Sequence, residues 1–238
     1  MTNSTTMSSG TRPSQPVAPV LIHIGTDVDP SIARELDRWS EEHILDNMKL
    51  PGFVSARRLR RVGPVAAPGT APDTLTLYQV ANVSALETPE YTGRKIELPR
   101  AFTDRLRFTR SLFREVGAES GVRTQEIGPA ILHVTVDVEP DWRARFVDWY
   151  AKVHVTAVLS APGMLGARRF ENVALAAGRD PAAGERSYCT LYEMEDPGVL
   201  ARPSTVAAAS KGACPPELAP HRVPFNHVYE EVFRAASK

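Results

Sequence analysis

The segment Val20-Leu-Ile-His-Ile-Gly-Thr-Asp-Val-Asp-Pro30 decides the fold, because a close copy follows 110 residues later as Ala130-Ile-Leu-His-Val-Thr-Val-Asp-Val-Glu-Pro140. The same offset carries Trp39 onto Trp149. Similarity at a fixed offset is the sequence signature of a repeated structural unit. The first question is therefore how far the repeat extends.

The match continues along the chain in the same order, with small changes of offset. One residue is added in the second copy after Trp149, so that His43 corresponds to His154. The later matches pair Pro51-Gly52 with Pro162-Gly163, Ala56-Arg57-Arg58 with Ala167-Arg168-Arg169, Thr76-Leu77-Tyr78 with Thr190-Leu191-Tyr192, Leu86 with Leu200, and Pro89 with Pro203. These matches predict a tandem duplication, with a first repeat at 19–127 and a second at 128–238.

Both copies have the same predicted order of elements. Each begins with a β-rich run that ends in Asp-x-Asp-Pro or Asp-x-Glu-Pro, which is a helix-start signal. Apolar residues at spacings of three and four, such as Ile32, Leu36 and Trp39, then predict an amphipathic helix that ends at Pro-Gly. The expected strands are 20–27, 53–59 and 75–80 in the first copy and 130–138, 164–170 and 188–194 in the second. Loops are expected at 63–73 and 174–186, and short helices near Ser84 and Gly198.

The last segment of each copy, 109–116 and 225–232, fits either a closing strand or the end of a helix, and the strand is preferred. The order β-α-β-β-α-β is that of the ferredoxin-like unit. The predicted fold class is therefore α+β, with two tandem ferredoxin-like units.

Composition excludes several classes of protein. The 238 residues carry 28 Lys and Arg against 28 Asp and Glu, so no positive field gathers nucleic acid. No apolar run approaches the ~20 residues of a membrane helix. The Ser/Thr/Pro-rich tail at 1–18 has no apolar core, so we expect disorder and no signal peptide. The two cysteines, Cys189 and Cys214, suit a reducing compartment, and a cytoplasmic location is expected.

Four motifs resemble the dimeric α/β barrel superfamily, in particular its EthD-like and related branches. They are Trp-Tyr-x-x-x-His at 149–154, Pro-Gly-Phe-x-Ser-Ala-Arg-Arg at 51–58, Thr-Leu-Tyr at 76–78 and 190–192, and Leu-x-x-Pro at 86–89 and 200–203. The resemblance covers residues 20–236. It implies that two sheets, usually supplied by two subunits, close face to face into a barrel within this one chain. Members of the superfamily include heme oxygenases, peroxidases, cofactor-free monooxygenases and lactone isomerases, so the fold does not decide the reaction.

Strand alternation makes His23 and His133 the first candidate catalytic residues. They lie on the face of each first strand opposite Ile22, Ile24 and Val134, and they point into the barrel if the two sheets close face to face. An imidazole there could act as a general acid or base, or ligate a metal or heme iron. The alternative is a structural histidine that satisfies a polar neighbour.

His43 and His154 form the second candidate pair. The resemblance implies a Glu-His pair five residues after the Trp, near the mouth of the cavity. The first half keeps Glu42-His43 but with a spacing of four, whereas the second keeps the spacing of five but has Val153 in place of the Glu. One residue turns a helix by about 100°, so the two histidines cannot share one orientation unless the helix distorts. Tyr150 lies one turn before His154 on the same stripe. The alternative is a capping or partly buried histidine.

Candidate substrate-binding residues follow on the middle strands. Alternation sends one member of Arg57-Arg58 and one of Arg168-Arg169 inward, where it could bind a carboxylate; Arg57 and Arg168 are the ones assigned to the site. Tyr78 and Tyr192 are expected to line the same cavity as the inward histidines, or to be barrel core. Trp39 and Trp149 are expected to be packing anchors. His227 is a weaker candidate and His221 carries little weight.

Three functional hypotheses remain open. The first is a cofactor-independent isomerase or lyase, in which a cavity histidine moves a proton and Arg or Tyr holds a substrate oxyanion, with a cofactor-free oxygenase as a close variant. The second is a heme-dependent oxygenase with His154 or another cavity histidine as ligand. The third is a non-catalytic binding or assembly module. No tightly held metal is expected. The expected partners are a small apolar or carboxylate-bearing molecule and a second copy of the fused unit, and one half alone is expected to hold the working site.

Overall fold

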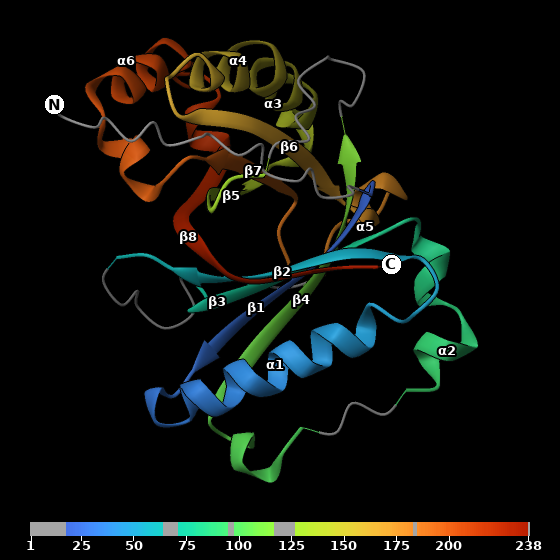
Figure 1. Ribbon diagram of the computed structural model, residues 1–238. Helices are drawn as coiled ribbons and strands as arrows, with labels where there is room; N and C mark the ends of the chain where they lie inside the picture. The colour runs from blue at the N-terminus through green and yellow to red at the C-terminus, as the bar shows by residue number, and fades with distance from the viewer. Residues whose placement is uncertain (1–17, 64–70, 95–97, 117–126, 183–184, 238) are drawn as a thin grey trace, which may run out of the picture.

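A computed structural model describes residues 18–63, 71–94, 98–116, 127–182 and 185–237 (Figure 1). The predicted disordered tail therefore lies outside the described residues, apart from Ala18. Eight antiparallel strands form one closed barrel in the order β1-β3-β2-β8-β5-β7-β6-β4, and β4 returns to β1. The strands are β1 (Val20–Val28), β2 (Phe53–Arg61), β3 (Thr74–Val80), β4 (Leu106–Val116), β5 (Ala130–Val138), β6 (Met164–Asn172), β7 (Tyr188–Met194) and β8 (Arg222–Ala236).

The barrel consists of two ferredoxin-like units from one chain. In the first unit the order is β4-β1-β3-β2, and in the second it is β8-β5-β7-β6. The two units meet at two seams, where β2 pairs with β8 and β4 pairs with β6. Both closing segments, 109–116 and 225–232, lie in strands, so the preferred reading of them is confirmed.

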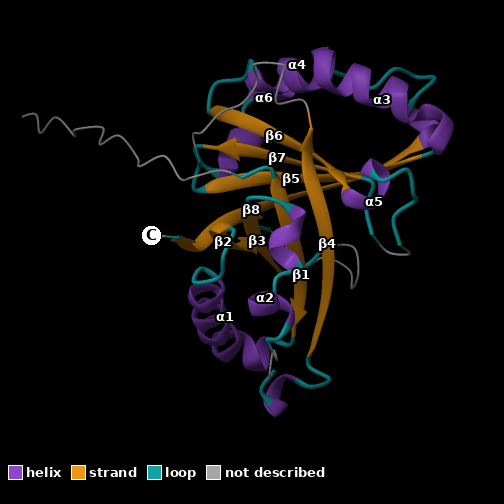
Figure 2. Ribbon diagram, turned by 90° about the vertical axis from the view of Figure 1, so that its right-hand side faces the viewer, coloured by secondary structure: helices purple, strands orange, loops and turns teal. Residues whose placement is uncertain are grey.

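Helices cover the outer face of each sheet (Figure 2). In the first unit α1 (Ala33–Asn47) packs on the sheet, and the short α2 (Pro89–Thr92) follows β3. In the second unit the cover comprises α3 (Arg143–Trp149), a π-helical turn (Tyr150–His154), α4 (Val155–Leu159) and α6 (Pro203–Lys211). The predicted loop after β6 opens with a further short helix, α5 (Val173–Ala176). Within the part of the chain that the structure describes, no helix is long and apolar enough to cross a membrane.

The start and end of α1 agree with the sequence signals. The Asp29 carboxylate accepts a hydrogen bond from the Ser31 amide at 2.9 Å, and Pro30 opens a short 3-10 turn that leads into the helix. After the helix, Gly52 adopts φ 82°, and a Cβ at this position would lie 2.6 Å from the Ala85 Cβ. Only glycine fits both the positive φ and the close approach, so Pro-Gly ends the helix sharply.

The π-helical turn accommodates the extra residue that separates Trp149 from His154 in the second unit, compared with Trp39 and His43 in the first. A π turn holds one more residue than an α-helical turn, so the helix regains its phase after it. His154 consequently packs against Trp149 with ring centroids 5.2 Å apart, as His43 stacks on Trp39 at 4.9 Å in the regular α1. The expected conflict in orientation is resolved by distortion of the helix.

Strand alternation divides the apolar residues between two kinds of core. Ten of them fill the barrel interior: Leu21, Leu59, Leu75, Leu77, Phe113, Ile131, Phe170, Cys189, Leu191 and Tyr229. Their neighbours along the strands point outward and pack under the helices, with Ile22 and Tyr78 below α1 and Val134 and Tyr192 below α3 and α4. The barrel interior is thus mainly a packed core.

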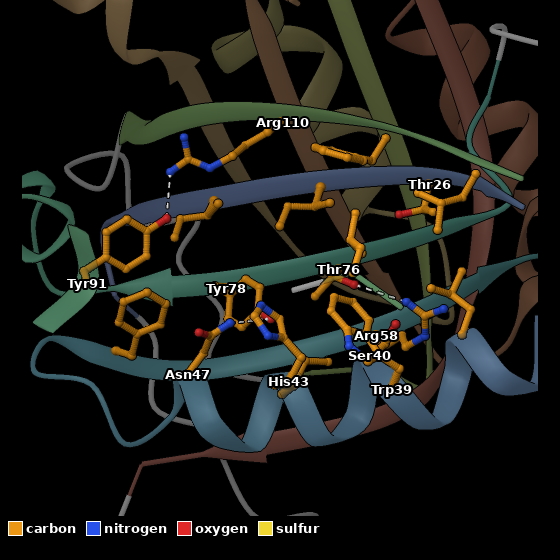
Figure 3. Close-up of a pocket in the computed structure, with 18 residues that line it drawn as sticks. Thr26, Trp39, Ser40, His43, Asn47, Arg58, Thr76, Tyr78, Tyr91 and Arg110 are labelled. Atoms are coloured by element: carbon orange, nitrogen blue, oxygen red, sulfur yellow. Dashed lines mark hydrogen bonds between the residues drawn. The ribbon is translucent and has the colours of Figure 1, made fainter. Parts of the chain in front are cut away.

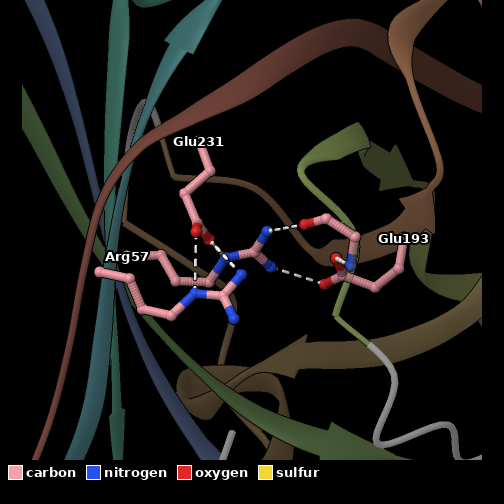
Figure 4. A network of polar contacts seen from close by, with 5 residues as sticks. Arg57, Glu193 and Glu231 are labelled. Carbon is pink, nitrogen blue, oxygen red and sulfur yellow. Dashed lines mark hydrogen bonds and ion pairs between the residues drawn. The ribbon is translucent and has the colours of Figure 1, made fainter. Parts of the chain in front are cut away.

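Buried ion pairs fasten both seams between the two units. At the first seam, the Arg57 guanidinium donates to Glu193 at 2.7 Å, to Glu231 at 2.6 Å and to the Gly128 carbonyl at 2.9 Å (Figure 4). The exposed fractions of the Arg57 and Glu193 side chains are 4% and 5%. Arg57 was expected to bind substrate. It instead joins the two units, because each of its three guanidinium nitrogens donates to a group of the second unit.

The second seam repeats this arrangement with the roles of the units exchanged. Arg168 donates to Glu115 at 2.8 Å and to the Ala18 carbonyl at 2.7 Å. The expectation that Arg168 binds substrate is likewise corrected, since its charge is neutralised by a carboxylate that is 4% exposed. Separation of the two units would break this ion pair, and a buried charge left without its partner carries a large free-energy penalty. The pair therefore opposes separation of the units.

Candidate functional site

A cavity of about 180 Å³ lies between α1 and the sheet of the first unit (Figure 3). Its walls are mainly apolar, with Ile22 and Ile24 from β1 and Leu36 and Ile44 from α1. Exposed Leu98 and Phe108 are also among its lining residues. An engineered apolar cavity of about 150 Å³ holds a benzene molecule, so this space suits a ligand with a small ring.

A chain of hydrogen bonds sets the state of the Tyr78 hydroxyl at the sheet wall of the cavity. Arg94 donates to the Asn47 carbonyl oxygen, which turns the amide nitrogen of Asn47 towards Tyr78. That nitrogen donates to the Tyr78 oxygen at 2.9 Å. Because the oxygen already accepts this bond, the Tyr78 proton remains free to be donated. Burial raises the pKa of Tyr78 to about 12, so the phenol stays protonated at neutral pH.

His43 is the titratable base of the same cavity. Its ring stacks on Trp39 with an interplanar angle of 6°. Burial lowers the pKa of His43, and the positive charge of Arg94 lowers it further. The imidazole is therefore neutral at neutral pH and can accept a proton. Trp39, expected to be a packing anchor, also lines the cavity.

Arg58 supplies a positive charge at another part of the wall. It is almost fully buried, and it donates to Asp37 on α1 at 2.9 Å and to Thr76 on β3 at 3.4 Å. Alternation thus sends Arg57 into the barrel and Arg58 under the helix. The charge of Arg58 is paired with Asp37. The cavity therefore combines a base and a hydroxyl donor around apolar walls, which suits the formation of an anion on a small molecule.

The corresponding space in the second unit is occupied by protein side chains. At the offset that pairs Trp39 with Trp149, Ser40 corresponds to Tyr150 and Leu36 to Phe146. Both aromatic side chains are buried in the core of the second unit. The Tyr192 hydroxyl donates to the Tyr150 oxygen at 3.1 Å. Tyr150, expected to bind substrate, here fills the position that the first unit leaves open.

Tyr78 and Tyr192 do not line the barrel interior, so that part of the prediction is wrong. In the sheet register Tyr78 lies opposite Ile22 and Tyr192 opposite Leu132, on the outer face under the helices. The residue opposite His23 is Leu77. The two inward histidines and the two tyrosines therefore belong to different compartments on opposite faces of the sheets.

His23 and His133 do point into the barrel, as the alternation predicts. Their Nε2 atoms lie 3.0 Å apart and both side chains are buried. Burial lowers the pKa of His23 to about 4 and lowers that of His133 well below its usual value. A second cavity of about 130 Å³ borders the pair, and His227 is among its lining residues. Because the two imidazoles bind one another, they form a structural contact between the units.

His154 and His221 have identifiable partners. The Nδ1 atom of His154 donates to the Gly212 carbonyl at 2.8 Å, which ties the π turn to α6. His221 stacks on Trp142 at 4.0 Å and lies 2.7 Å from a Glu139 carboxylate oxygen. Neither contact requires a ligand.

Sequence patterns did not single out Ser40 and Asn47, which line the first-unit cavity, or Arg94, which orients Asn47. Ser40 and Asn47 share one helical stripe with His43, and polar residues on the sheet-facing side of an amphipathic helix are a usable signal. Arg94 gave no signal, since it follows α2 in a connecting segment and reaches Asn47 only through the tertiary fold.

A heme group does not fit either helix–sheet layer. The first-unit cavity is of the size of a single ring system, and Arg58, which could serve a propionate, is engaged by Asp37. In the second unit, Phe146 and Tyr150 fill the space in front of His154. Among the described residues, no group of three or more His, Cys, Asp or Glu side chains is placed to hold a metal ion.

Solved structures with the same architecture are similar to nearly the whole chain. An anthrone oxidase-like protein is 14% identical with a TM-score of 0.60, and the match covers 94% of this chain and 95% of that one. The chain has the dimeric α/β barrel fold. A protein from Fusobacterium nucleatum, provisionally assigned as a monooxygenase, is 9% identical with a TM-score of 0.53 and coverages of 92% and 95%. A mutant chlorite dismutase from Candidatus Nitrospira defluvii is 11% identical with a TM-score of 0.52 and coverages of 92% and 93%.

Neither a model of a known protein family nor a curated protein sequence matches this chain significantly. At these identities the structural likeness concerns the fold alone. The function has to be argued from the site.

Proposed function

We propose that the first-unit cavity is the active site of a cofactor-independent enzyme that transfers a proton on a small, largely apolar molecule. The observation that carries this proposal is the Tyr78 hydroxyl, which accepts from Asn47 and so keeps its own proton available in the same apolar cavity as neutral His43. A base and an oxyanion donor in one mainly apolar cavity are the minimal set for enolate chemistry.

The residues divide the reaction between them. The His43 imidazole takes a proton from a carbon or oxygen of the substrate. Negative charge then develops on a substrate oxygen, to which Tyr78 donates its hydrogen bond. Return of the proton from His43 to a different atom gives an isomerase, whereas loss of a leaving group from the anion gives a lyase.

A cofactor-free oxygenase is the second candidate. In this variant the same substrate anion reacts with dioxygen after His43 has removed the proton. It rests on the same His43 and Tyr78 pair, and oxidation is the activity named for the anthrone oxidase-like protein that shares this fold. The two candidates share the first step and differ in the fate of the anion.

Deuterium exchange tests the shared step. Hydroxyaromatic ketones, lactones and β-diketones are incubated with the protein in D₂O without oxygen, and deuterium incorporation is followed by NMR. We expect exchange that His43→Gln abolishes and Tyr78→Phe lowers by roughly 100-fold, in the range reported for loss of one oxyanion donor. Glu42→Gln, at an exposed neighbouring position, serves as the control. A non-catalytic binding module would bind these ligands without deuterium exchange. When oxygen is added, an oxygenase would consume it together with the substrate, whereas an isomerase or lyase would not.

We further propose that one ancestral unit was duplicated and that only the first copy kept an open site. The two units repeat the same seam contacts. In each unit, the backbone amide two residues before the first strand donates to a side chain of β3 or of β7. Ala18 donates to Gln79 at 2.9 Å, and Gly128 donates to Glu193 at 3.0 Å. The proposal predicts that His43→Gln is far more damaging to exchange than His154→Gln. Equal losses would show two working sites.

A further inference from the structure

We propose that the ligand of the first-unit cavity is a phenol, that is, an aromatic ring that carries a hydroxyl group. This inference rests on the proposed active site and names the chemical class that the site binds. Its basis is the second unit, where the chain itself places a phenol, the side chain of Tyr150, in the equivalent space. The second unit therefore displays how a bound phenol is held.

The surroundings of the Tyr150 hydroxyl define the polar end of this internal ligand. Its oxygen accepts from the Tyr192 hydroxyl at 3.1 Å, and it also makes a hydrogen bond with the Thr190 side chain. The positive charge of Arg169 acts on the hydroxyl groups of both tyrosines. Two hydroxyl groups and a cation thus surround the oxygen of a ring that is otherwise buried.

The surroundings of the Tyr150 ring define the aromatic end. The Phe146 ring lies 5.1 Å from it and the His154 ring 4.9 Å from it, between centroids. Trp149 meets it edge to face at 5.7 Å. These are the separations at which aromatic rings attract one another.

Every one of these six neighbours has a counterpart in the wall of the first-unit cavity. Around the hydroxyl position, Tyr192, Thr190 and Arg169 correspond to Tyr78, Thr76 and Arg58. Around the ring, Trp149, His154 and Phe146 correspond to Trp39, His43 and Leu36. All six counterparts line the cavity. Five of the six keep the residue type, and the sixth exchanges one apolar side chain for another.

The first unit differs in the residue that would supply the phenol. Ser40 stands where the second unit has Tyr150, and its short side chain leaves the volume of the ring vacant, within the cavity of about 180 Å³. The hydroxyl donor is also better prepared, because Asn47 replaces Val158 and donates to Tyr78. A free phenol in this cavity would therefore meet the same ring contacts and a hydroxyl that is directed towards it.

Binding of p-cresol, which is the tyrosine side chain as a free molecule, tests the inference on the full chain. Isothermal titration should give one p-cresol per chain and an affinity at least tenfold above that for toluene, which has the same shape without the hydroxyl. Ser40→Tyr should abolish binding, since it copies the second unit. Ser210→Tyr, at an exposed position on α6, should bind as the unmodified chain does.

Tyr78→Phe provides a readout that a folding defect would not imitate. This variant should bind p-cresol and toluene with similar affinity, because only the preference for the hydroxyl is lost. Toluene binding as tightly as p-cresol to the unmodified chain, or full p-cresol binding by Ser40→Tyr, would overturn the inference.

The converse variant, Tyr150→Ser, should open the second site. We expect it to bind two p-cresol molecules per chain and to gain more thermal stability on addition of p-cresol than Tyr150→Phe, which keeps a ring in the second site and should bind one molecule, at the first-unit cavity. An unchanged stoichiometry in folded Tyr150→Ser would contradict the inference.

The outcomes separate this inference from the proposed function. Stoichiometric p-cresol binding with no exchange dependent on His43 would leave the phenol site standing and refute the enzyme. Deuterium exchange that depends on His43 but is not inhibited by p-cresol would support the enzyme and refute the phenol site.

Discussion

The Nε2 atoms of His23 and His133 lie 3.0 Å apart inside the barrel, where β1 of one unit faces β5 of the other. At this separation one Nε2 carries a proton and donates it to the unprotonated Nε2 of its partner. The accepting imidazole must be neutral, and because burial lowers the pKa of both histidines, both are neutral at neutral pH. Each also meets an aromatic ring edge-on, Phe113 at 6.0 Å and Tyr229 at 5.8 Å. The pair stabilises the junction of the units only while it is uncharged.

We expect this pair to make the fold sensitive to acid. The unfolded chain binds a proton at His23 below its ordinary pKa of 6.5, whereas the folded protein resists protonation down to a pKa of about 4. The contribution of neutral His23 to the free energy of unfolding is thus fully present above pH 6.5. It is lost as the pH falls towards 4, and the total loss is about 3 kcal/mol. Urea unfolding at pH 7.5, 6 and 5 measures the loss. His23→Asn should flatten the dependence, and an equal pH dependence in that variant would refute the assignment.

Removal of the Arg57 guanidinium should destabilise the junction strongly. Arg57→Met leaves buried Glu193 without its counter-charge, and breaking such a pair costs about 3–5 kcal/mol. Arg60→Met is the matched control, because the Arg60 side chain is 55% exposed and its pair with Asp37 is worth less than about 1 kcal/mol. Chemical denaturation of both variants gives the comparison. Similar free energies of unfolding would show that the seam does not depend on this ion pair.

The acid limb of the reaction should report His43. Because burial and Arg94 lower the pKa of His43, kcat/KM should rise with pH through a midpoint below 6.5. It should then stay level until Tyr78 begins to lose its proton, towards a pKa of about 12. The rate of deuterium exchange between pH 4.5 and 10 gives the profile. A midpoint above 7 would exclude His43 as the base.

Deletion of one residue should be tolerated in the π turn and not in the regular helix. Without Ala151 the second unit regains the four-residue spacing that Trp39 and His43 show in α1, so the later residues keep their phase. Without Glu41 the end of α1 turns by about 100° and withdraws buried Ile44 from the core. We expect the free energy of unfolding to fall by about 1 kcal/mol on deletion of Ala151 and by more than about 3 kcal/mol on deletion of Glu41. Thermal unfolding of the two variants tests this, and a reversed order would contradict it.

The repeat and the two periodicities were sufficient to predict the fold. A period of two in β1 and β5 assigns Ile22 to the outer face and His23 to the inner one, because the pleat leaves no other choice. A period near 3.6 in α1 gives its buried face in the same way. These patterns do not predict which face of the sheet borders a cavity, because apolar residues lie on both faces.

The site residues were predictable only where local geometry determines them. Tyr78 and His43 were selected as functional types, but Tyr78 was assigned to the wrong compartment because its cavity depends on how α1 packs on the sheet. Arg57 had the chemistry of an anion-binding residue, and its partners Glu193 and Glu231 are more than 130 residues distant in the sequence. Spacing within one strand holds no information on such partners.

The charged seams have a consequence for synthesis of the chain on the ribosome. When the first unit has emerged, β2 and β4 are its unpaired edges, and each carries a charge that later becomes buried, on Arg57 and Glu115. Inward-pointing charges on an open edge oppose its pairing with a foreign strand. The nascent half is thus protected from aggregation until β6 and β8 arrive. Arg57 and Glu115, which later form buried ion pairs across the seams, thus also guard the open edges of the first half before the second half is made.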